Sequence, residues 1–273
     1  MAGKGAGLDV HPRGERFPGR RGGVARRPHS PPHRADRVIR LDRGAGRWTV
    51  TLDRADKANA LSLAMLERLD TVFAEAQADP DLRVLVVTGA GERAFCAGAD
   101  LAEARDATAI TTNPLWDSVS RRLANLPCLT IAALNGTLAG GGFGLALACD
   151  LRLAVPEAKF FYPVLRNGFL PQHMDVQRMQ ALIGPSRTRL ILLAGQKLGA
   201  DEALAIGLID RIVERADMAA EIDILGAAAL AGKPEVLVAI KRMGQAGADV
   251  LDDCYAAVYR GDDKAHARLR GWV

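Results

Sequence analysis

The hydrophobic pattern of the chain becomes regular near Val38, where it predicts short strands. Residues 38–53, VIRLDRGAGRWTVTLD, place two short apolar runs around a glycine-rich turn, which is typical of a β-hairpin. Trp48, Val50 and Leu52 alternate with polar residues, so we expect these three side chains on one buried face. The ordered part of the chain is therefore expected to begin with a hairpin.

A helical spacing of apolar residues follows. Ser62 is a suitable N-cap, because its hydroxyl can accept a hydrogen bond from the first helical turn. The apolar positions that recur at helical spacing are Met65, Leu66, Leu69, Val72, Phe73 and Ala76. ADPDL at 78–82 ends this helix, and RVLVVTG at 83–89 is a continuous β-branched run. Such a run predicts a strand that is covered on both faces.

Strand and helix patterns then alternate. Residues 122–136 predict the end of a helix and a second buried strand, and LRLAV at 151–155 predicts a third. Between them lie three glycines and an apolar run that predicts a helix. This alternation with short links predicts an α/β fold with parallel strands. From about residue 174 the chain is expected to be mostly helical, with glycine stops in 184–195 and 200–213.

The charge of the chain is concentrated at its N-terminus. Residues 1–36 hold eight Lys/Arg against three Asp/Glu, whereas the rest of the chain is close to neutral. The protein's net charge of +4 therefore gives no reason to expect nucleic-acid binding. This Arg/Pro/Gly-rich tail lacks periodicity and is predicted to be disordered and dispensable. An inert extension is the preferred interpretation, ahead of a segment that binds an acidic partner or a transit peptide.

Composition otherwise excludes several classes of protein. No apolar run reaches the ~20 residues of a membrane span, and no signal peptide is evident, so we expect a cytoplasmic protein that does not bind membranes. The four cysteines show no metal-type spacing. They are expected to be buried, reduced thiols, and no metal site is predicted.

Two glycine-rich turns carry the candidate chemistry. NGTLAGGGFGLALACD at 135–150 places glycines between a strand and a helix, where a ligand can approach the backbone. The free N–H groups of such a helix favour a phosphate or an oxyanion. The spacing does not fit a dinucleotide fingerprint, and close packing alone is the structural alternative. RAFCAGADL at 93–101 is a similar turn. Together the two turns could form the oxyanion hole for a thioester.

Five segments carry a family resemblance. They are DKANALS, AFCAGADL, LNGTLAGGGFGLALACDLRLA, ALIGPSRTRLILLAGQKLGADEALAIGLIDRIV and AIKR. In order and spacing they resemble the crotonase superfamily of enoyl-CoA hydratases and isomerases, over about residues 38–245. The resemblance implies an α/β spiral of β-β-α units at 37–215 and a helical C-terminal trimerisation region at 216–273. A homotrimer or a hexamer is the implied assembly.

The resemblance also implies a site for an acyl-CoA thioester. The thioester carbonyl is expected between the backbone N–H groups of Ala99 and Gly141, and coenzyme A belongs to the substrate, so no permanently bound cofactor is expected. Other positions that match the family's binding segments are Lys57, Ala58, Ala60, Ala97, Gly98 and Gly140. Lys241 matches a residue that could reach a CoA phosphate. For Lys57 and Lys241 an ordinary surface position is the alternative interpretation.

Two positions depart from the family's pattern. Hydratases of the family carry glutamates where this chain has Gly144 and Val164, and neither residue can transfer a proton. Addition of water needs one group to activate the water and one to protonate carbon. Efficient hydration is therefore not expected. Gly144 makes room and Val164 makes the wall apolar, which suggests that an acyl group occupies the space of the carboxylates.

Other polar residues are candidates to replace the lost pair. His173 and Asp175, in the predicted loop after Pro171, are the candidate catalytic substitutes, with a surface position as the alternative. Tyr162 and Arg166 flank Val164 and are candidate polar contacts to the substrate. Trp116 is expected to contact the acyl group or to belong to the core.

Three hypotheses follow for the function. The first is a divergent lyase or decarboxylase that stabilises a thioester enolate, because loss of CO₂ needs no general base. The second is a non-catalytic protein that binds or delivers acyl-CoA. The third is a structural subunit that supports an active relative in a mixed oligomer. A parallel test of binding and turnover discriminates among them.

Overall fold

A six-stranded sheet forms the larger of two β-sheets. The structure is a computed structural model that describes residues 38–100, 102, 112–245 and 250–271, so the predicted tail at 1–36 lies outside the described part. The strand order is β1-β2-β3-β5-β7-β9. The strands are β1 (Ile39–Arg43), β2 (Arg47–Leu52), β3 (Val84–Gly89), β5 (Leu129–Leu134), β7 (Leu151–Ala154) and β9 (Arg211–Ile212). The hairpin β1–β2 is antiparallel and each later pair is parallel, which confirms both predictions.

A second sheet of three short strands was not predicted from the sequence. It contains β4 (Ala94–Cys96), β6 (Thr137–Ala139) and β8 (Phe160–Phe161), in that order and in parallel. Each of these strands follows a strand of the large sheet: β4 follows β3, β6 follows β5, and β8 follows β7. The chain therefore winds as a spiral of β-β-α units, and the turns after β4 and β6 come to lie at the same edge.

The first long helix, α1 (Leu63–Ala78), confirms the predicted periodicity. Ser62 caps it, with its hydroxyl accepting a hydrogen bond from the Met65 N–H at 3.3 Å. All six apolar residues predicted for the buried face of this helix are buried. A cap and one apolar stripe thus account for the start and the orientation of α1.

The other helices that the structure describes follow α1 in the β-β-α units and then make up most of the C-terminal part. They are α4 (Leu115–Ala124), α5 (Phe143–Ala146), α6 (Val164–Asn167), α7 (His173–Leu192), α8 (Ala200–Ala205), α9 (Met218–Ala231), α10 (Pro234–Gln245), α11 (Leu251–Tyr259) and α12 (Asp263–Arg270). Three-residue 3₁₀ turns occur at Ala55–Lys57, Gly140–Gly142 and Arg215–Asp217. The apolar helix predicted after the glycines is shorter than expected: α5 spans one turn, because the chain leaves the helix after Ala146 to reach β7.

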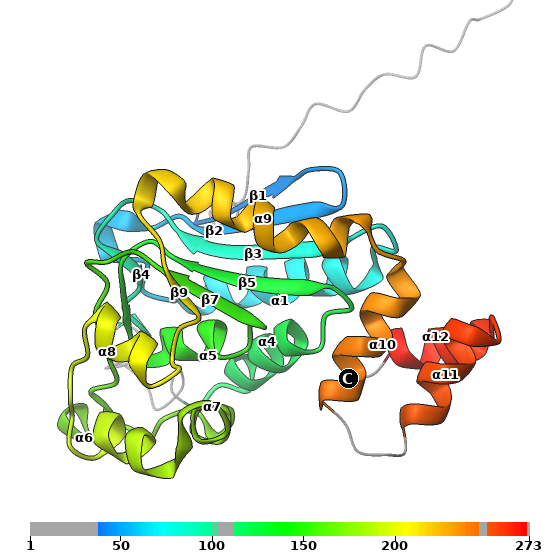
Figure 1. Ribbon diagram of the computed structural model, residues 1–273. Helices are drawn as coiled ribbons and strands as arrows, with labels where there is room; N and C mark the ends of the chain where they lie inside the picture. The colour runs from blue at the N-terminus through cyan, green and yellow to red at the C-terminus, as the bar shows by residue number, and fades with distance from the viewer. Residues whose placement is uncertain (1–37, 101, 103–111, 246–249, 272–273) are drawn as a thin grey trace, which may run out of the picture. The chain divides into compact units, whose positions relative to one another are not determined.

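Both faces of the large sheet are covered. Leu85 and Val87 of β3 belong to the main core beside α1, whereas Val84 and Val86 belong to a second cluster beneath α9. Figure 1 shows α9 on one side of the sheet and α1, α4 and α5 on the other. The continuous apolar run of β3 is explained by this double burial, as predicted.

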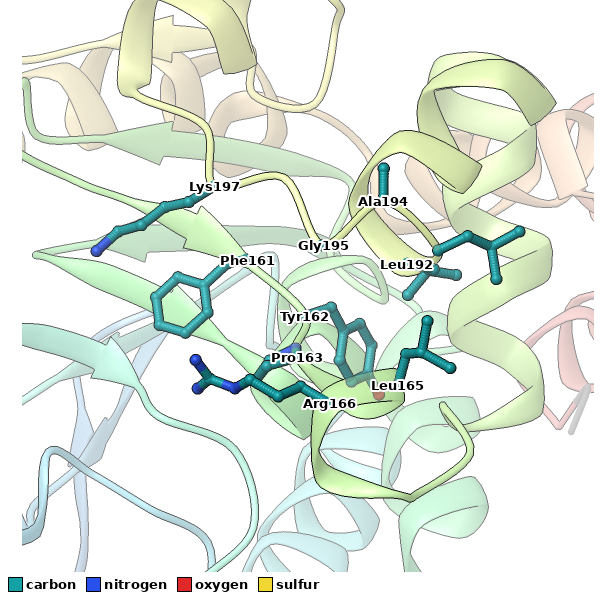
Figure 2. Close-up of a pocket in the computed structure, with 10 residues that line it drawn as sticks. Phe161, Tyr162, Pro163, Leu165, Arg166, Leu192, Ala194, Gly195 and Lys197 are labelled. Carbon is teal, nitrogen blue, oxygen red and sulfur yellow. The ribbon is translucent and has the colours of Figure 1, made fainter.

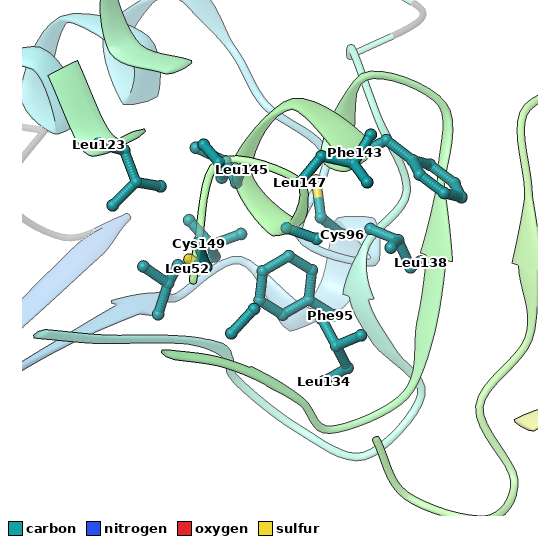
Figure 3. Packing of buried hydrophobic residues seen from close by; sticks show 14 of the residues in the cluster. Leu52, Phe95, Cys96, Leu123, Leu134, Leu138, Phe143, Leu145, Leu147 and Cys149 are labelled. Atoms are coloured by element: carbon teal, nitrogen blue, oxygen red, sulfur yellow. The ribbon is translucent and has the colours of Figure 1, made fainter. Parts of the chain in front are cut away.

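The main core extends between the two sheets. Phe95 of β4, Leu134 of β5 and Phe143 of α5 are fully buried in it. Figure 3 shows these side chains gathered with Cys96 and Cys149 around the short helix α5. All four cysteines are buried and free, as predicted. Burial raises the pKa of the Cys96, Cys128 and Cys149 thiols to about 12, so these thiols stay protonated at neutral pH.

The last three helices have a small core of their own. Val238, Cys254 and Leu269 belong to this cluster of α10, α11 and α12. Arg242 is 2% exposed and joins it to the rest of the fold, because its guanidinium donates to the Leu269 and Asn125 carbonyl oxygens at 2.9 and 2.7 Å. No helix within the described ranges is both long and apolar enough to cross a membrane.

Candidate active site

The turns after β4 and β6 touch each other through their backbones. Gly98 has a φ of +97° and Gly140 a φ of +51°, conformations that favour glycine. A Cβ at Gly98 would lie 3.0 Å from the Gly141 nitrogen and 3.2 Å from the Ala139 oxygen. Glycine at 98 is thus required both by the conformation and by the close approach of the second turn.

Ala99 is held by a neighbouring segment without using its own N–H group in that contact. Leu61 forms a parallel bridge with Ala99, in which the Leu61 N–H donates to the Gly98 oxygen at 2.7 Å. The Asp100 N–H donates to the Leu61 oxygen at 2.9 Å. Arg54 pairs with the Asp100 carboxylate at 2.8 Å, which gives Asp100 a structural role. Since the bridge uses residues on either side of Ala99, the Ala99 N–H is left for another acceptor.

Gly141 presents its N–H group at the start of a helical segment. It lies in the 3₁₀ turn Gly140–Gly142, which runs into α5. The first N–H groups of a helix have no partner within the helix. Ala99 and Gly141 line one cavity of about 80 Å³, which we call the outer cavity. Of the residues predicted from the sequence, Ala97, Ala99, Trp116, Gly140, Gly141, Tyr162 and Val164 line this cavity.

A smaller space, the inner cavity, continues behind Gly141. Gly144 and Asp175 line it, and it shares Trp116, Gly141 and Gln172 with the outer cavity. Its volume of about 10 Å³ is close to the smallest space that holds a single water molecule. Gln172 was not predicted, although it lies in the segment that follows Val164.

Trp116 forms a wall of both cavities. It is 5% exposed, and the position of a Cβ at Gly141 would be 2.8 Å from its Cη2 and Cζ3 atoms. The indole ring therefore packs directly against Gly141. Trp116 belongs to the core, as one of its two interpretations predicts, and it borders the site; its contact with an acyl group stays a prediction.

The place beside Gly144 is occupied by the carboxyl group of Asp175. A Cβ at Gly144 would lie 3.2 Å from Oδ1 and 3.7 Å from Oδ2 of Asp175. Asp175 is 1% exposed and belongs to the first turn of α7, not to the predicted loop. The surface alternative for Asp175 is therefore wrong. His173 begins the same helix, but its side chain lies outside the described part of the structure.

Tyr162 fixes one oxygen of that carboxyl group. Its hydroxyl donates to Oδ2 of Asp175 at 2.8 Å, and its ring stacks on Phe143 with 5.3 Å between centroids. Oδ1 of Asp175 is buried and has no hydrogen-bond partner among the described residues. Desolvation raises the pKa of Asp175 to about 7, against the opposing effects of the Tyr162 hydroxyl and the Arg178 guanidinium. Desolvation also raises the pKa of Tyr162 well above its usual value.

The opposite wall, at Val164, is apolar. Val164 is half-buried at the start of α6 and lines the outer cavity with Phe169 and Leu170. Its backbone is fixed by a hydrogen bond from the Val164 N–H to the Tyr162 oxygen at 2.9 Å. No carboxylate lines the outer cavity on this side among the residues that the structure describes.

The predicted CoA-binding segment lies next to the first turn. The Ala97 N–H donates to the Ala58 oxygen at 3.0 Å, which brings these two predicted residues together. Ala58 and Asn59 have φ angles of +50° and +55°. The Asn59 amide secures this strained pair by donating to the Ala90 and Ala94 oxygens at 3.0 and 2.8 Å. Lys57 is exposed and Ala60 half-buried, and their contact with CoA stays a prediction.

Lys241 does not reach the cavities. Its ammonium group donates to Asp150 at 2.7 Å and to the Cys128 oxygen at 2.9 Å, and its side chain is 8% exposed. The pairing with Asp150 ties α10 to the loop between α5 and β7. The predicted role of Lys241 at a CoA phosphate is therefore corrected, because its charge is enclosed and already paired.

A third space, the side cavity, opens on the other side of Tyr162. It has a volume of about 600 Å³ and is lined by Phe161, Arg166 and Lys197 among others. Figure 2 shows Arg166 and Lys197 extending beside the Phe161 ring, and the Lys197 Nζ lies 5.0 Å from the centroid of that ring. Arg166 is exposed and lines this cavity and not the outer one. The position of Lys197 at this cavity was not predicted from the sequence, since no motif distinguishes it from a surface lysine.

The chain is similar in sequence to known proteins over most of its length. Residues 42–257 match the family model described as enoyl-CoA hydratase/isomerase. The short-chain-enoyl-CoA hydratase of Clostridium acetobutylicum is 36% identical over 172 residues, which cover 62% of this chain and 66% of that protein. The carnitinyl-CoA dehydratase of Escherichia coli O157:H7 is 31% identical over 226 residues, which cover 82% of this chain and 86% of that protein.

Solved structures show the same fold. An enoyl-CoA hydratase/carnithine racemase from Magnetospirillum magneticum has a TM-score of 0.76 at 31% identity, covering 85% of this chain and 92% of that one. DspI from Pseudomonas aeruginosa has a TM-score of 0.70 at 27% identity, covering 82% and 86%. The predicted α/β spiral of β-β-α units with a helical C-terminal region is thereby confirmed.

Proposed function

The chain belongs to the enoyl-CoA hydratase/isomerase family, and on that premise we propose that it converts a short acyl-CoA thioester through an enolate. In this proposal the thioester oxygen accepts hydrogen bonds from the N–H groups of Ala99 and Gly141. The reaction is of the lyase or decarboxylase type and not hydration. Coenzyme A takes part only as the carrier of the acyl group.

The contact between the two turns is the observation that carries the proposal. The Gly98 and Gly141 backbones approach so closely that a methyl group at Gly98 would lie only 3.0 Å from the Gly141 nitrogen. Ala99 and Gly141 face one cavity from these two turns. Two fixed donors at one oxygen stabilise an oxyanion, and one such donor contributes roughly 3 kcal/mol to the transition state.

The polar groups of the cavities argue for an enolate that is protonated once. Hydration requires a base for water and an acid for carbon at the same time. Among the described residues that line the outer and inner cavities, Asp175 supplies the only carboxyl group. Loss of CO₂ from a malonyl-type thioester needs only enolate stabilisation and one later proton, which one carboxyl group can deliver.

The size of the cavities favours a short acyl group. The inner cavity has room for about one water molecule, and Trp116 closes it against Gly141. A long acyl chain would have to displace Trp116 or the buried Leu66. The proposed substrates are therefore thioesters with two to four acyl carbons.

A non-catalytic acyl-CoA-binding protein is the second candidate function. The apolar wall at Val164, Phe169 and Leu170 favours it, because such a wall binds an acyl group without any chemistry. The backbone donors serve binding equally well. Only turnover separates this candidate from the first.

The deciding experiment measures binding and turnover on the same samples. Acetyl-, propionyl-, malonyl-, crotonyl- and 3-hydroxybutyryl-CoA are titrated by calorimetry, and the products are identified by mass spectrometry. Binding with release of CO₂ from malonyl-CoA supports the enzyme. Binding without any product supports the second candidate, and absence of binding to every thioester contradicts both.

We further propose that the protein assembles as a homotrimer or a hexamer in the cytoplasm. The helical region from Met218 onward supports the assembly, because it leaves Ile240, Met243, Tyr255 and Tyr259 exposed in this chain. Light scattering that gives the mass of a folded monomer would contradict it.

A further inference from the structure

We propose that Asp175 is the catalytic proton donor of this site and delivers its proton from Oδ1 to the α-carbon of the thioester enolate. The inference rests on the proposed function, because it requires an enolate bound at Ala99 and Gly141. Tyr162 is assigned as the positioning residue that orients the Asp175 carboxyl group.

The carboxyl group of Asp175 lies beside Gly144 in the wall of the inner cavity. Glycine at 144 leaves a space in the wall of the inner cavity, and α7 fills that space with Asp175 from outside the glycine-rich segment. Oδ1 lies 3.2 Å from where a Cβ at Gly144 would be. A side chain at 144 would therefore be in tight contact with the carboxyl group of Asp175.

The two carboxyl oxygens of Asp175 have unequal surroundings. Oδ2 accepts a hydrogen bond from the Tyr162 hydroxyl at 2.8 Å, whereas Oδ1 is buried and has no partner in the part of the chain that the structure describes. Buried polar atoms are normally hydrogen-bonded, and exceptions concentrate where a ligand or a proton-transfer role completes them. Because Tyr162 donates to Oδ2, the proton of the neutral acid belongs on Oδ1.

The inner cavity, which Asp175 lines, borders the outer cavity, which Ala99 and Gly141 line. Asp175, Gly141 and Trp116 line the inner cavity, and the last two also line the outer cavity. The α-carbon of a thioester is one bond from its carbonyl carbon. A carbonyl oxygen at the Gly141 N–H therefore keeps the α-carbon close to Gly141 and Trp116, which border both cavities; in the proposed orientation this carbon faces Asp175.

Burial keeps a large share of the Asp175 carboxyl group neutral near pH 7. Burial raises its pKa to about 7; the Tyr162 hydroxyl and Arg178 oppose this shift, and Asp117 on α4 reinforces it. Arg178 is itself engaged, since its guanidinium donates to the Ser120 hydroxyl on α4. A group whose pKa is near the working pH can both give and regain a proton.

The proposed step balances without a further reactant. Loss of CO₂ breaks the bond between the α-carbon and the carboxylate, and the electron pair passes into the enolate. A C–H bond then forms between the α-carbon and the proton on Oδ1, while the enolate returns to the thioester. Asp175 is left as a carboxylate and regains its proton from solvent.

The test uses the reverse of this proton transfer, which any short acyl-CoA reports. The full-length protein is incubated with propionyl-CoA in D₂O, and deuterium uptake at C2 is followed by mass spectrometry. We expect Asp175→Asn to bind propionyl-CoA within about 3-fold of the parent and to lose at least ~10²-fold in exchange rate. Exchange by the parent should rise with pH through about 7 and then level off, because the carboxylate is the base in this direction.

Two variants separate the role of Asp175 from a structural one. Tyr162→Phe removes a hydrogen bond that lowers the pKa of Asp175, so the pH midpoint of exchange should move upward. Asp117→Asn removes a charge that raises this pKa, from a residue that lines neither the inner nor the outer cavity. It should keep the maximal rate and move the midpoint downward.

The outcomes distinguish this inference from the proposed function. Equal exchange by the parent and by Asp175→Asn overturns the assignment of Asp175 and leaves the enolate mechanism standing. Binding by the parent without exchange overturns the assignment and favours the non-catalytic candidate. Absence of binding by the parent overturns the proposed function, and the assignment with it.

Discussion

The two sides of the candidate site, at Gly144 and at Val164, differ in the chemistry of their lining residues. On the Gly144 side, a carboxyl group from α7 stands 3.2 Å from the position of a Cβ at Gly144. On the Val164 side, the wall is made of Val164, Phe169 and Leu170, with no carboxyl group among the described lining residues. One side therefore carries a carboxyl group, and the three named residues of the other side are apolar.

The difference limits the chemistry to one proton at a time. A pair of carboxyl groups can activate water and protonate carbon together, whereas a single carboxyl group supplies only one of these two functions at a time. The acid at Asp175 and the apolar wall at Val164 are therefore consistent with enolate protonation and inconsistent with efficient addition of water.

The sharpest way to break the comparison is to look for hydration. Crotonyl-CoA hydration by the parent protein should be at least ~10³-fold slower than the ~10 s⁻¹ of an ordinary enzyme, since one of two proton-transferring groups is absent. Loss of absorbance of the enoyl thioester measures it, with a hydratase that carries both glutamates as the control. Turnover of ~10 s⁻¹ would show that a second proton-transferring group acts on the Val164 side of the site.

Both sides depend on the backbone donors, which the Gly141→Pro variant tests next. Proline removes the N–H group, and acyl-CoA affinity should fall at least ~10²-fold. Gly141→Ala is the matched control, because its Cβ meets the same Trp116 ring atoms at 2.8 Å but it keeps the N–H group. Calorimetry with propionyl-CoA measures both variants. Equal losses for proline and alanine would assign the effect to Trp116 and not to the donor.

The occupancy of the two sides predicts unequal tolerance of a restored glutamate. Gly144→Glu should destabilise the fold by about 3 kcal/mol, because it collides with Asp175 and buries a second carboxylate. Val164→Glu should cost less than about 1 kcal/mol, since position 164 is half-buried beside the exposed Leu165 and Leu170. Urea unfolding measures both. Asp175→Ala should rescue Gly144→Glu, and failure of that rescue would contradict the tight contact between positions 144 and 175.

The smallest effect is a pH dependence of stability from Asp175. Its folded pKa of about 7 lies above the unfolded value near 3.9, so its contribution is present below pH 4 and is lost as the pH rises through 7. Asp175→Asn does not titrate, so its stability relative to the parent should be roughly 2 to 3 kcal/mol greater at pH 8 than at pH 5. If Asp175→Asn and the parent differ in unfolding free energy by the same amount at both pH values, the pKa of Asp175 is not raised in the folded protein.

Much of the fold could be predicted from local patterns because local packing decides it. The six buried residues of α1 and the alternating Trp48, Val50 and Leu52 are all buried as expected. The small sheet was missed because β8 has two residues and β4 and β6 three, too few to show a period of two. The length of α5 was overestimated, since its apolar residues are buried whether or not they are helical.

The site divides in the same way. The family resemblance predicts Ala99 and Gly141 as the backbone donors, and the structure places both residues at one cavity. The burial of Asp175 could not be predicted, since it depends on how α7 packs against α4 and α5. Nor could the pairing of Lys241 with Asp150, which joins residues 91 positions apart in the sequence.

The backbone contact between the two turns also shapes how substitutions are tolerated along them. At Gly98 every L-residue meets both a φ of +97° and the Gly141 nitrogen, and at Gly142 a Cβ would lie 2.8 Å from that of Cys96. Ala97, one position before Gly98, has an exposed side chain at the rim of the outer cavity and meets no such backbone crowding. A saturation-mutagenesis map of this region should therefore show isolated positions that tolerate no substitution beside positions that do. Changes in specificity should accordingly be sought in the helices that line the cavities, while the two glycine-rich turns are left unchanged.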